Sequence, residues 1–370
     1  MSAPEEVFDL IVLGSGAAGF AAAATATRKG LKVLLVEKAA QFGGTSAISG
    51  GGIWIPNNHY FKAKGGQDSY DKALQYILAA GGGKADETKV RAYLDHAPKM
   101  IKYLEDKSRV RYAVAEKYPD YYQHLPGALP GGRSLDPELF DTSLLGDELK
   151  NLRTPSPSTL LMGRIAWTAR DAHKAMAKER GWRFKVLGLM LRYKFDFRWR
   201  RKSKFDRRAG LGSSLVCALR ASLLDRKVPL WLKTDFRELV LDGDRVIGVR
   251  VSREGRELTL MARRGVILGA GGFEQNQALR EKYLPQPTKA AWSATPPADL
   301  STVTAIGVEV TQPLANGDYI EVQVNMTAPQ YATDEIEDYY GKYISNSAMC
   351  SVVRNSNTGD TIALSDRPEN

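Results

Sequence analysis

The strongest constraint on the fold of this chain is a strand–turn–helix–strand pattern near its beginning. Residues 8–37 read FDLIVLGSGAAGFAAAATATRKGLKVLLVE. The apolar run Phe8–Leu13 predicts a buried strand, the alanine-rich stretch Ala17–Lys29 predicts a helix, and Leu31–Val36 predicts a second buried strand. A strand, a helix and a strand in this order form a βαβ unit. The sequence therefore predicts an α/β fold of the Rossmann type, built on a parallel sheet.

Three glycines and one acid lie where a βαβ unit contacts a dinucleotide. Gly14, Gly16 and Gly19 form the pattern G-x-G-x-x-G directly after the first strand. Such glycines allow a tight turn, the close approach of a pyrophosphate and close packing of the helix on the strand. The helix N-terminus then attracts the phosphates. Glu37, at the end of the second strand, can accept hydrogen bonds from a ribose diol, so these residues predict dinucleotide binding.

A second glycine-rich segment indicates which dinucleotide binds. The stretch KAAQFGGTSAISGGGIWIP follows the second strand at once. In a nicotinamide enzyme an ordinary helix usually follows here. Instead, Thr45, Ser46 and Ser49 offer hydroxyl groups, and Gly50–Gly52 can lie flat against a planar ring; the apolar residues around them disfavour a flexible linker. A long cofactor with a ribityl chain and an isoalloxazine ring would use the whole stretch, so the sequence predicts FAD.

The composition excludes several other classes of protein. The chain has 370 residues, of which 43% are hydrophobic and 25% charged, as in folded proteins of one or two domains. Its two cysteines cannot form a disulfide framework or a cysteine metal cluster, and none of its four histidines is four residues from another, so no metal site is expected. No signal-peptide pattern opens the sequence. These features predict a cytoplasmic protein.

The net charge of +10 is unevenly distributed. Residues 1–297 hold 49 Lys and Arg against 31 Asp and Glu, whereas residues 298–370 hold 3 against 11. The segment Arg192–Arg208, RYKFDFRWRRKSKFDRR, has nine basic residues interleaved with aromatic ones. Such a run is most often a solvated face. Two further interpretations are a surface that contacts anionic lipid and, with no nucleic-acid module beside it, a surface for nucleic acid. The sequence favours weak peripheral membrane association over nucleic-acid binding.

The middle of the chain is helical at first and then aromatic. Asp68–Ala80 and Glu87–Asp106 repeat apolar residues every three or four positions, which predicts two amphipathic helices. The segment Ala115–Asp141 is rich in Pro, Gly and Tyr and too broken for a core element. Its tyrosines either pack among themselves or line an apolar pocket with their hydroxyl groups directed at a ligand. These are Tyr118, Tyr121 and Tyr122.

The second half returns the chain to the nucleotide-binding fold. Residues 228–273 alternate in hydrophobicity, with DGDR and REGR as turns, which predicts a series of strands that ends at a G-A-G-G turn. We therefore expect an FAD-binding domain from residues 1–60 and 209–297, interrupted by a helical insertion at 61–208. Residues 298–370 are expected to form an incomplete α+β substrate or cap domain.

Taken together, these segments resemble the 3-ketosteroid Δ1-dehydrogenase branch of the succinate dehydrogenase/fumarate reductase flavoprotein superfamily. The resemblance implies non-covalently bound FAD and dehydrogenation of ring A of a 3-ketosteroid. In this family one hydrogen leaves the carbon beside the ketone as a proton, and its neighbour goes to flavin N5 as a hydride. The electrons then pass to an acceptor other than NAD. The motifs, within residues 7–297, are FGGTSAISGGGIWIPNN, KYPDYY, PGGRSLDPELFD, WRRKSKFDRR, ARRGVILGAGGFEQNQALREKYL and WSATPP.

The resemblance also implies roles for single residues. The active-site tyrosine of the family falls on Tyr121, with Tyr118 as an aromatic wall of the steroid cavity. A phenol suits an apolar cavity because its neutral form costs less to bury than a carboxylate. Removal of the proton beside a ketone needs a base together with a donor that stabilises the enolate. The implied FAD contacts are Gly14, Ser15, Gly16, Ala17, Ala18, Gly19, Glu37, Lys38, Gly44, Thr45, Ser46, Ser49, Gly50, Gly51, Gly52, Phe236, Ala270, Gly271 and Gly272.

Beyond residue 297 the resemblance fades. The segment ADLSTVTAIGVEV stands where the family has Asn-Thr-Gly-Asp opening a helix. The family pattern also continues for a further domain's worth of residues. Two interpretations stay open. Either the chain is a shortened or diverged relative with weak flavin binding and impaired catalysis, or its tail supplies the remaining contacts, with Tyr319 as the second active-site tyrosine.

Two hypotheses from other classes accompany the dehydrogenase. A fumarate-reductase-like enzyme would need Arg and His side chains that converge on the two carboxylates of a dicarboxylate substrate, and the aromatic segment argues against it. A catalytically impaired flavin-binding remnant or interaction protein would keep the glycine motifs but lack the C-terminal segment of the family. The dehydrogenase hypothesis is the one that uses both the flavin loop and the tyrosine segment.

Overall fold

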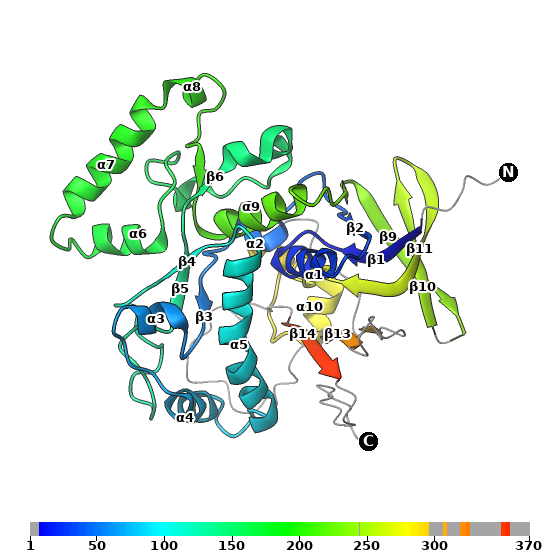
Figure 1. Cartoon of the computed structure of the whole chain (residues 1–370), viewed down its shortest axis with the longest axis horizontal. Coiled ribbons are helices and arrows are strands. Elements are labelled where there is room, and N and C mark those ends of the chain that lie inside the picture. The colour runs from blue at the N-terminus through cyan, green and yellow to red at the C-terminus, as the bar shows by residue number, and fades with distance from the viewer. Residues whose placement is uncertain (1–6, 244, 296–305, 309–318, 326–348, 356–370) are drawn as a thin grey trace. The chain divides into compact units, whose positions relative to one another are not determined.

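The computed structural model has two compact units, each with its own core. The first consists of Met1–Thr45 and Leu223–Asn370, and the second of Ser46–Ser222. The structure describes residues 7–243, 245–295, 306–308, 319–325 and 349–355, the last three segments as backbone only (Figure 1). The expected domain boundaries near residues 60, 209 and 297 stay a prediction.

A six-stranded sheet forms the centre of the first unit. Its strands run in the order β8-β2-β1-β11-β10-β9. Strand β1 pairs in parallel with β2 and β11, and β2 pairs in parallel with β8, whereas β11, β10 and β9 pair antiparallel. The bounds are β1 Val7–Leu13, β2 Val33–Val36, β8 Leu230–Trp231, β9 Thr234–Asp242, β10 Arg245–Arg253 and β11 Arg256–Leu268.

Helix α1 (Ala17–Arg28) connects β1 to β2 and packs against β1, β2 and β11 (Figure 1). Its buried face is made mainly of glycine and alanine, which lets the helix lie close to the sheet. Phe20 is the one large side chain on that face, and its ring meets the ring of Phe42 edge-on at 5.9 Å. The βαβ unit predicted from the sequence is thereby confirmed, with all three elements within two residues of their expected bounds.

The return of the chain to this sheet is also confirmed. The stretch predicted as alternating strands contains β8 to β11, with turns at the two expected places. Gly243 and Gly255 both have positive φ angles, of 58° and 76°, which glycine adopts without steric strain. Strand β11 then places its last residues beside β1, so Leu268 pairs with Leu13 at the carboxyl edge of the sheet.

The second unit is mainly helical, with two small sheets, β3-β5-β4 and β6-β7. It contains the two amphipathic helices predicted from the sequence, now α4 and α5. In chain order its elements are α2 Gly44–Ile48, β3 Ile53–Trp54, α3 His59–Ala63, α4 Tyr70–Ala80, α5 Glu87–Lys107, β4 Tyr112–Val114, β5 Ser134–Pro137, β6 Phe140–Asp141, η1 Thr142–Asn151, η2 Pro157–Thr159, α6 Ala169–Met176, α7 Trp182–Phe195, α8 Phe197–Arg200, β7 Arg208–Ala209 and α9 Leu211–Leu224, of which α2 begins and α9 ends two residues outside the bounds of the unit.

Side-chain caps fix where α4 and α5 begin. The Ser69 hydroxyl accepts a hydrogen bond from the first turn of α4, and the Asp86 carboxylate accepts two from α5. The helices pack against each other through Ala73, Val90 and Leu94, which are buried. This pair forms one of the apolar clusters that support the loops of the unit.

The C-terminal part of the first unit begins with α10 (Gln277–Tyr283) and η3 (Ala290–Trp292). Beyond them, β12 (Ile306–Val308), β13 (Tyr319–Asn325) and β14 (Met349–Asn355) form an antiparallel three-stranded sheet. Tyr319 opens β13, and its side chain lies outside the described part of the structure. The role expected of Tyr319 and the expected cap domain stay predictions.

Two kinds of feature are absent from the described residues. None of the helices there is both long and apolar enough to cross a membrane. Nor do three or more His, Cys, Asp or Glu side chains in this part of the chain lie in a group that could hold a metal ion.

Candidate functional site

The turn after β1 is built so closely that only glycine fits it. Gly14 has a φ angle of 97°, and a Cβ atom there would lie 2.1 Å from the carbonyl oxygen of Gly269. The Gly14 amide donates to the carbonyl of Val36 at 2.7 Å, and the Gly269 amide donates to the carbonyl of Leu13 at the same distance. The ends of β1, β2 and β11 therefore meet at this turn.

The third glycine of the motif brings α1 against the same turn. A Cβ atom at Gly19 would lie 2.0 Å from the carbonyl oxygen of Gly14. Gly16 is the N-cap residue of α1 and has no side chain to place over the first helical turn. The positive end of the helix dipole is thus presented beside a turn with glycines on both sides of Ser15. This arrangement suits the two negative charges of a pyrophosphate.

The carboxylate of Glu37 is hydrogen-bonded to this turn. One carboxylate oxygen of Glu37 accepts hydrogen bonds from both the amide (3.0 Å) and the hydroxyl of Ser15, and the other accepts from the Ala39 amide at 2.8 Å. The buried Ser15 hydroxyl also accepts from the Gly43 amide at 3.1 Å. The acid is therefore oriented before any ligand arrives, and its oxygens retain further acceptor capacity for a ribose.

The other expected FAD contacts of the first unit lie around this cradle. Gly44 approaches Gly16, because a Cβ atom on Gly44 would be 3.9 Å from the Gly16 Cα. Ala270–Gly272 follow Gly269 after the end of β11, and the Ala270 amide nitrogen would lie 3.2 Å from a Cβ atom on Gly14. Phe236 lies in β9, two residues after Thr234, whose amide donates to the carbonyl of Glu37 at 3.0 Å. Lys38 and Thr45 adjoin Glu37 and Gly44 in the chain.

These residues fit a dinucleotide. A turn that excludes a Cβ atom at Gly14 and Gly19, an uncapped helix N-terminus and an oriented carboxylate lie together in one unit, in the order that phosphates and ribose require. Sequence reasoning identified these residues but not the hydrogen bonds from Ser15 to Glu37. A serine between two glycines gives no sign of a partner 22 residues away.

The glycine loop of the second unit has a structural role that sequence reasoning missed. A Cβ atom at Gly51 would lie 2.6 Å from the amide nitrogen of Gly212, at the start of α9, and one at Gly212 would lie 2.0 Å from the carbonyl oxygen of Ser46. The Gly212 amide donates to the carbonyl of Ser49 at 2.9 Å. Gly51 is thus required by contact with α9, whereas a Cβ atom at Gly50 would meet nothing within 4 Å. Of these glycines, Gly50 leaves the most room for a planar ring.

The tyrosine segment forms an exposed loop of the second unit. Tyr121 is 81% exposed and Tyr118 is 42% exposed, and their rings lie 6.4 Å apart in an edge-to-face arrangement. A hydrogen bond with Tyr121, assisted by partial burial, raises the pKa of Tyr118 above that of a free phenol. The structure therefore brings the two expected active-site tyrosines together. Their catalytic roles stay predictions.

A buried ion cluster under this loop was not foreseen. Arg133 is 1% exposed and forms ion pairs with Asp68 and Asp120, both at 2.8 Å. Asp120 also accepts a hydrogen bond from the Trp54 indole at 2.7 Å. Asp120 stands between Tyr118 and Tyr121 in the sequence, so the tyrosine loop is fixed to the interior of the unit at that point.

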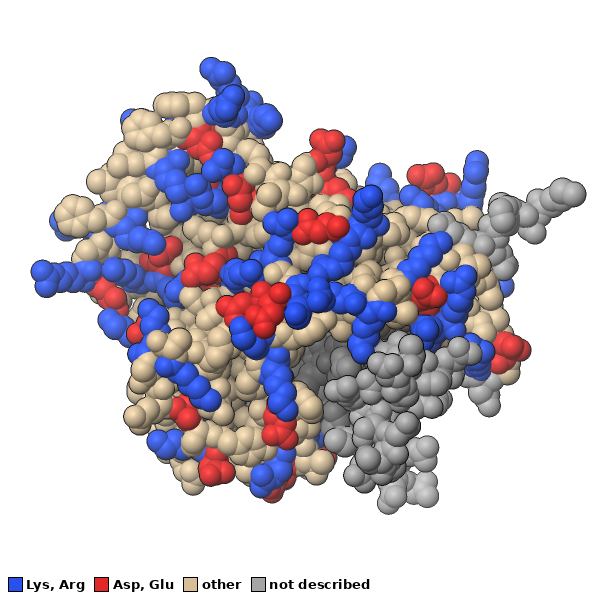
Figure 2. Space-filling model, in the orientation of Figure 1, with Lys and Arg blue, Asp and Glu red and all other residues tan. Residues whose placement is uncertain are grey.

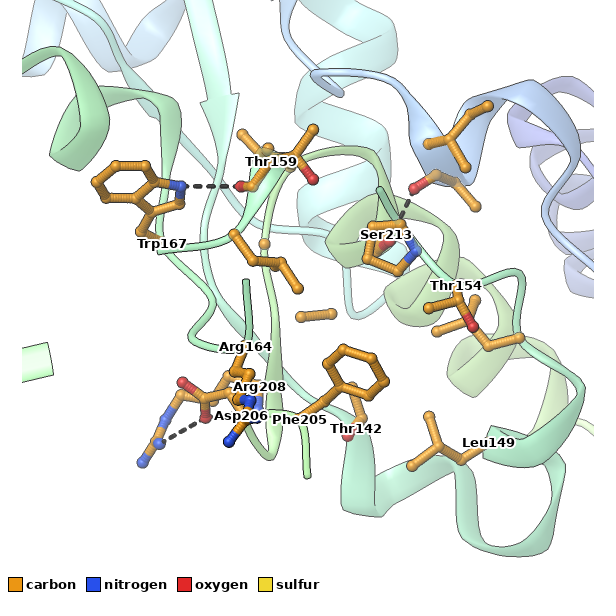
Figure 3. A pocket seen from close by; sticks show the side chains of 18 of the residues that line it. Thr142, Leu149, Thr154, Thr159, Arg164, Trp167, Phe205, Asp206, Arg208 and Ser213 are labelled. Carbon is orange, nitrogen blue, oxygen red and sulfur yellow. Dashed lines mark hydrogen bonds and ion pairs between the residues drawn. The ribbon is translucent and has the colours of Figure 1, made fainter. Parts of the chain in front are cut away.

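A cavity of about 110 Å³ lies elsewhere in the second unit. Its wall is mainly apolar, with charged side chains gathered at one end (Figure 3). Neither Tyr118 nor Tyr121 lines it. The wall consists of Ala47, Ile48, Ser49, Thr142, Leu149, Leu152, Thr154, Pro155, Thr159, Leu160, Arg164, Trp167, Phe205, Asp206, Arg208, Ala209, Gly210, Leu211 and Ser213.

Comparison with known proteins identifies relatives of this chain. The FAD binding domain family matches residues 9–330. A 3-oxosteroid 1-dehydrogenase of Comamonas testosteroni is 43% identical over 287 residues, which cover 77% of this chain and 50% of that protein. A crystal structure of 3-ketosteroid delta1-dehydrogenase from Sterolibacterium denitrificans, in complex with 1,4-androstadiene-3,17-dione, matches with a TM-score of 0.78 and 51% identity. That match covers 81% of this chain and 54% of the other.

The chain spans about half the length of these relatives. The resemblance seen in its sequence motifs is confirmed by the matches. A flavocytochrome c3 fumarate reductase also matches, with a TM-score of 0.53 and 18% identity over 81% of this chain and 39% of that one. This match shows a shared fold alone, so the fumarate reductase hypothesis stays secondary to the dehydrogenase.

Proposed function

Because the chain belongs to the FAD binding domain family, we propose that it carries the FAD cradle and the proton-transferring tyrosine loop of a 3-ketosteroid Δ1-dehydrogenase. The observation that carries this proposal is the pairing of Tyr121 with Tyr118 on an anchored loop. The relatives that share this chain's sequence at 43% and 51% identity are named for dehydrogenation of 3-oxosteroids. The expected electron acceptor is one other than NAD.

The reaction removes two hydrogens from neighbouring carbons beside a ring ketone. FAD, when bound, supplies the acceptor for the hydride. The protein must move the other hydrogen as a proton, and we assign this transfer to Tyr121. The rings of Tyr118 and Tyr121 lie 6.4 Å apart edge to face, and the interaction with Tyr121 raises the pKa of Tyr118. The proton can then leave through solvent, because Tyr121 is exposed in its unit.

Replacement of Tyr121 by phenylalanine tests this assignment. General acid–base groups contribute about 10²–10⁴-fold to rate, so we expect Tyr121→Phe to reduce kcat for Δ1-dehydrogenation of a 3-ketosteroid by roughly that factor. Flavin content should not change, since Tyr121 lies outside the phosphate cradle. The matched control is Tyr122→Phe, on the same loop. Unchanged turnover in Tyr121→Phe, measured with an artificial electron acceptor, would show that the proton is moved elsewhere.

We also propose that the region from α6 to α8 contacts an anionic membrane surface. On α7, Phe184, Leu187, Leu191 and Phe195 recur every three or four residues and are exposed, Phe184 to 81%. They form an apolar stripe on one face of the helix. Lys and Arg side chains gather around α8 beside it, at the top of Figure 2. An apolar face flanked by cations is the pattern of helices that lie in a membrane interface.

Basic residues at this surface should make the association sensitive to salt. Arg198 and Arg201 are both exposed, and each cation near an anionic bilayer contributes about 1 kcal/mol. We expect the double variant Arg198→Gln/Arg201→Gln to weaken binding to phosphatidylserine vesicles by about 2 kcal/mol at low salt. The control with equal charge is Lys62→Gln/Lys99→Gln. Equal sedimentation of both variants with vesicles would contradict the proposal, and with it a location at the inner face of a membrane.

A further inference from the structure

We propose that Asp120, paired with Arg133, is a positioning residue that sets the geometry of the Tyr118–Tyr121 pair. The inference rests on the proposed function, because it concerns the loop that carries the expected catalytic tyrosine. Asp120 does not approach a substrate: its side chain is 2% exposed. It acts through the main chain, because Tyr118 and Tyr121 lie on either side of it in the sequence.

Asp120 is held from all sides. One carboxylate oxygen accepts from the Trp54 indole at 2.7 Å, and the other accepts from Arg133 at 2.8 Å and from the Leu129 amide at 2.9 Å. Its own amide donates to the carbonyl of Leu129 at 3.0 Å. Both main chain and side chain are fixed, so residue 120 cannot rotate without breaking several of these bonds. The positions of residues 118 and 121 follow from it.

Arg133 carries this constraint into the core of the unit. Its guanidinium forms a fork on Asp68, with distances of 3.0 and 2.8 Å, while its remaining nitrogen binds Asp120. The guanidinium also lies 5.5 Å from the ring of Trp54 and 5.6 Å from that of Tyr76. Three hydrogen bonds and two aromatic-ring contacts of an arginine that is 1% exposed define a single geometry.

Trp54 makes this cluster a link between two functional segments. Strand β3, which contains Trp54, directly follows the glycine loop, and its indole is bound to Asp120 of the tyrosine loop. The amide of Tyr122 is bound in turn to the Tyr76 hydroxyl at 3.2 Å. The end of the glycine loop and the tyrosine loop are therefore held at a fixed distance within one unit.

The reactivity of the two phenols reports on this geometry. Tetranitromethane nitrates phenolate, and the hydrogen bond with Tyr121 raises the pKa of Tyr118, so Tyr118 should react more slowly than Tyr121 in the wild type. If Asp120→Asn releases the loop, this hydrogen bond is lost. The ratio of Tyr118 to Tyr121 nitration, measured by peptide mass spectrometry at pH 8, should then rise severalfold. A residue that merely supports the fold would lower stability and leave the ratio of the folded protein unchanged.

A second pair of variants separates an effect on the positions of the tyrosines from a loss of stability. Arg133→Lys keeps the positive charge but cannot form the fork, and it should raise the same ratio. Arg220→Lys is the matched control, because Arg220 is also 1% exposed and forms a fork on Glu148, with both distances 2.6 Å. It should lose stability without changing the ratio. An unchanged ratio in folded Asp120→Asn or Arg133→Lys, or an equal rise in Arg220→Lys, would overturn the proposal.

Measurements of activity distinguish the positioning role of Asp120 from the proposed dehydrogenase function. In the FAD-loaded protein, Asp120→Asn should lower kcat severalfold and leave KM and flavin content near their wild-type values. If the wild type shows no dehydrogenation, the proposed function fails, yet the nitration ratio still decides whether Asp120 positions the tyrosines. If the wild type is active and Asp120→Asn keeps full turnover, the positioning role fails alone.

Discussion

Gly19→Ala should strongly weaken FAD binding. The added Cβ atom would lie 2.0 Å from the carbonyl oxygen of Gly14, a backbone atom that cannot move without displacing the end of β1. The helix must instead shift away from the turn, and with it the N-terminus that faces the pyrophosphate. Overpacking of this kind typically costs about 1–3 kcal/mol, which corresponds to a rise of roughly 5- to 140-fold in the dissociation constant for FAD.

The matched control for this variant is another helical glycine. Gly188 lies in α7, and a Cβ atom there would meet nothing within 4 Å. Gly188→Ala should therefore leave FAD affinity unchanged and raise helix stability by up to about 1 kcal/mol. Quenching of flavin fluorescence measures the affinity of each variant. Wild-type affinity in Gly19→Ala would mean that the cradle tolerates a side chain and that the pyrophosphate lies elsewhere.

Arg133→Met should be among the most destabilising single substitutions in the second unit. It removes the cation that Asp68 and Asp120 share and leaves two carboxylates whose side chains are each 2% exposed. Breaking a buried pair by removal of one partner costs about 3–5 kcal/mol, a large fraction of the stability of a typical domain. Arg220→Met should cost less, because the side chain of its partner Glu148 is 32% exposed and can be solvated. Urea denaturation of the three proteins measures the difference.

The effect of Arg133→Met should depend on pH in a defined direction. Burial alone would raise the pKa of Asp68, but hydrogen bonds from Arg133 and from the amides of Asn57 and Ser69 outweigh it and lower the pKa. A depressed carboxyl pKa stabilises the fold above the ordinary value of about 4, and that stability is lost as the pH falls through the folded-state pKa. Without Arg133, burial dominates and protonation becomes favourable. The deficit of the variant relative to the wild type should therefore shrink between pH 7 and pH 4.5, and a constant deficit would contradict this account.

The features of this protein that could be predicted from its sequence are those set by local patterns. An apolar run, a glycine motif and an alanine-rich helix determine a βαβ unit, because each element is specified by its own residues and by the next few. The hairpin turns near Gly243 and Gly255 are equally local. The helices α4 and α5 follow from apolar spacing and from capping residues at their starts.

What could not be predicted depends on contacts between distant parts of the chain. Arg133 and Asp68 are separated by 65 residues, and nothing near either one indicates the other. For the same reason the glycines of the flavin loop were all interpreted as facing the cofactor, although Gly51 is required by the start of α9. The sequence did not divide the basic run into elements, and the structure places its residues in α7, α8, the loop that follows and the first residue of β7.

The flavin content of the purified chain tests the central claim most directly. The protein should be titrated with FAD, separated from free flavin, and its bound FAD measured by absorbance after denaturation. We predict equimolar FAD on the wild type and little on Gly19→Ala, since both the cradle and its glycine are required. A folded wild-type chain that retains no flavin at any FAD concentration would contradict the account, because the glycine turn and the oriented Glu37 would then serve some purpose other than holding the cofactor.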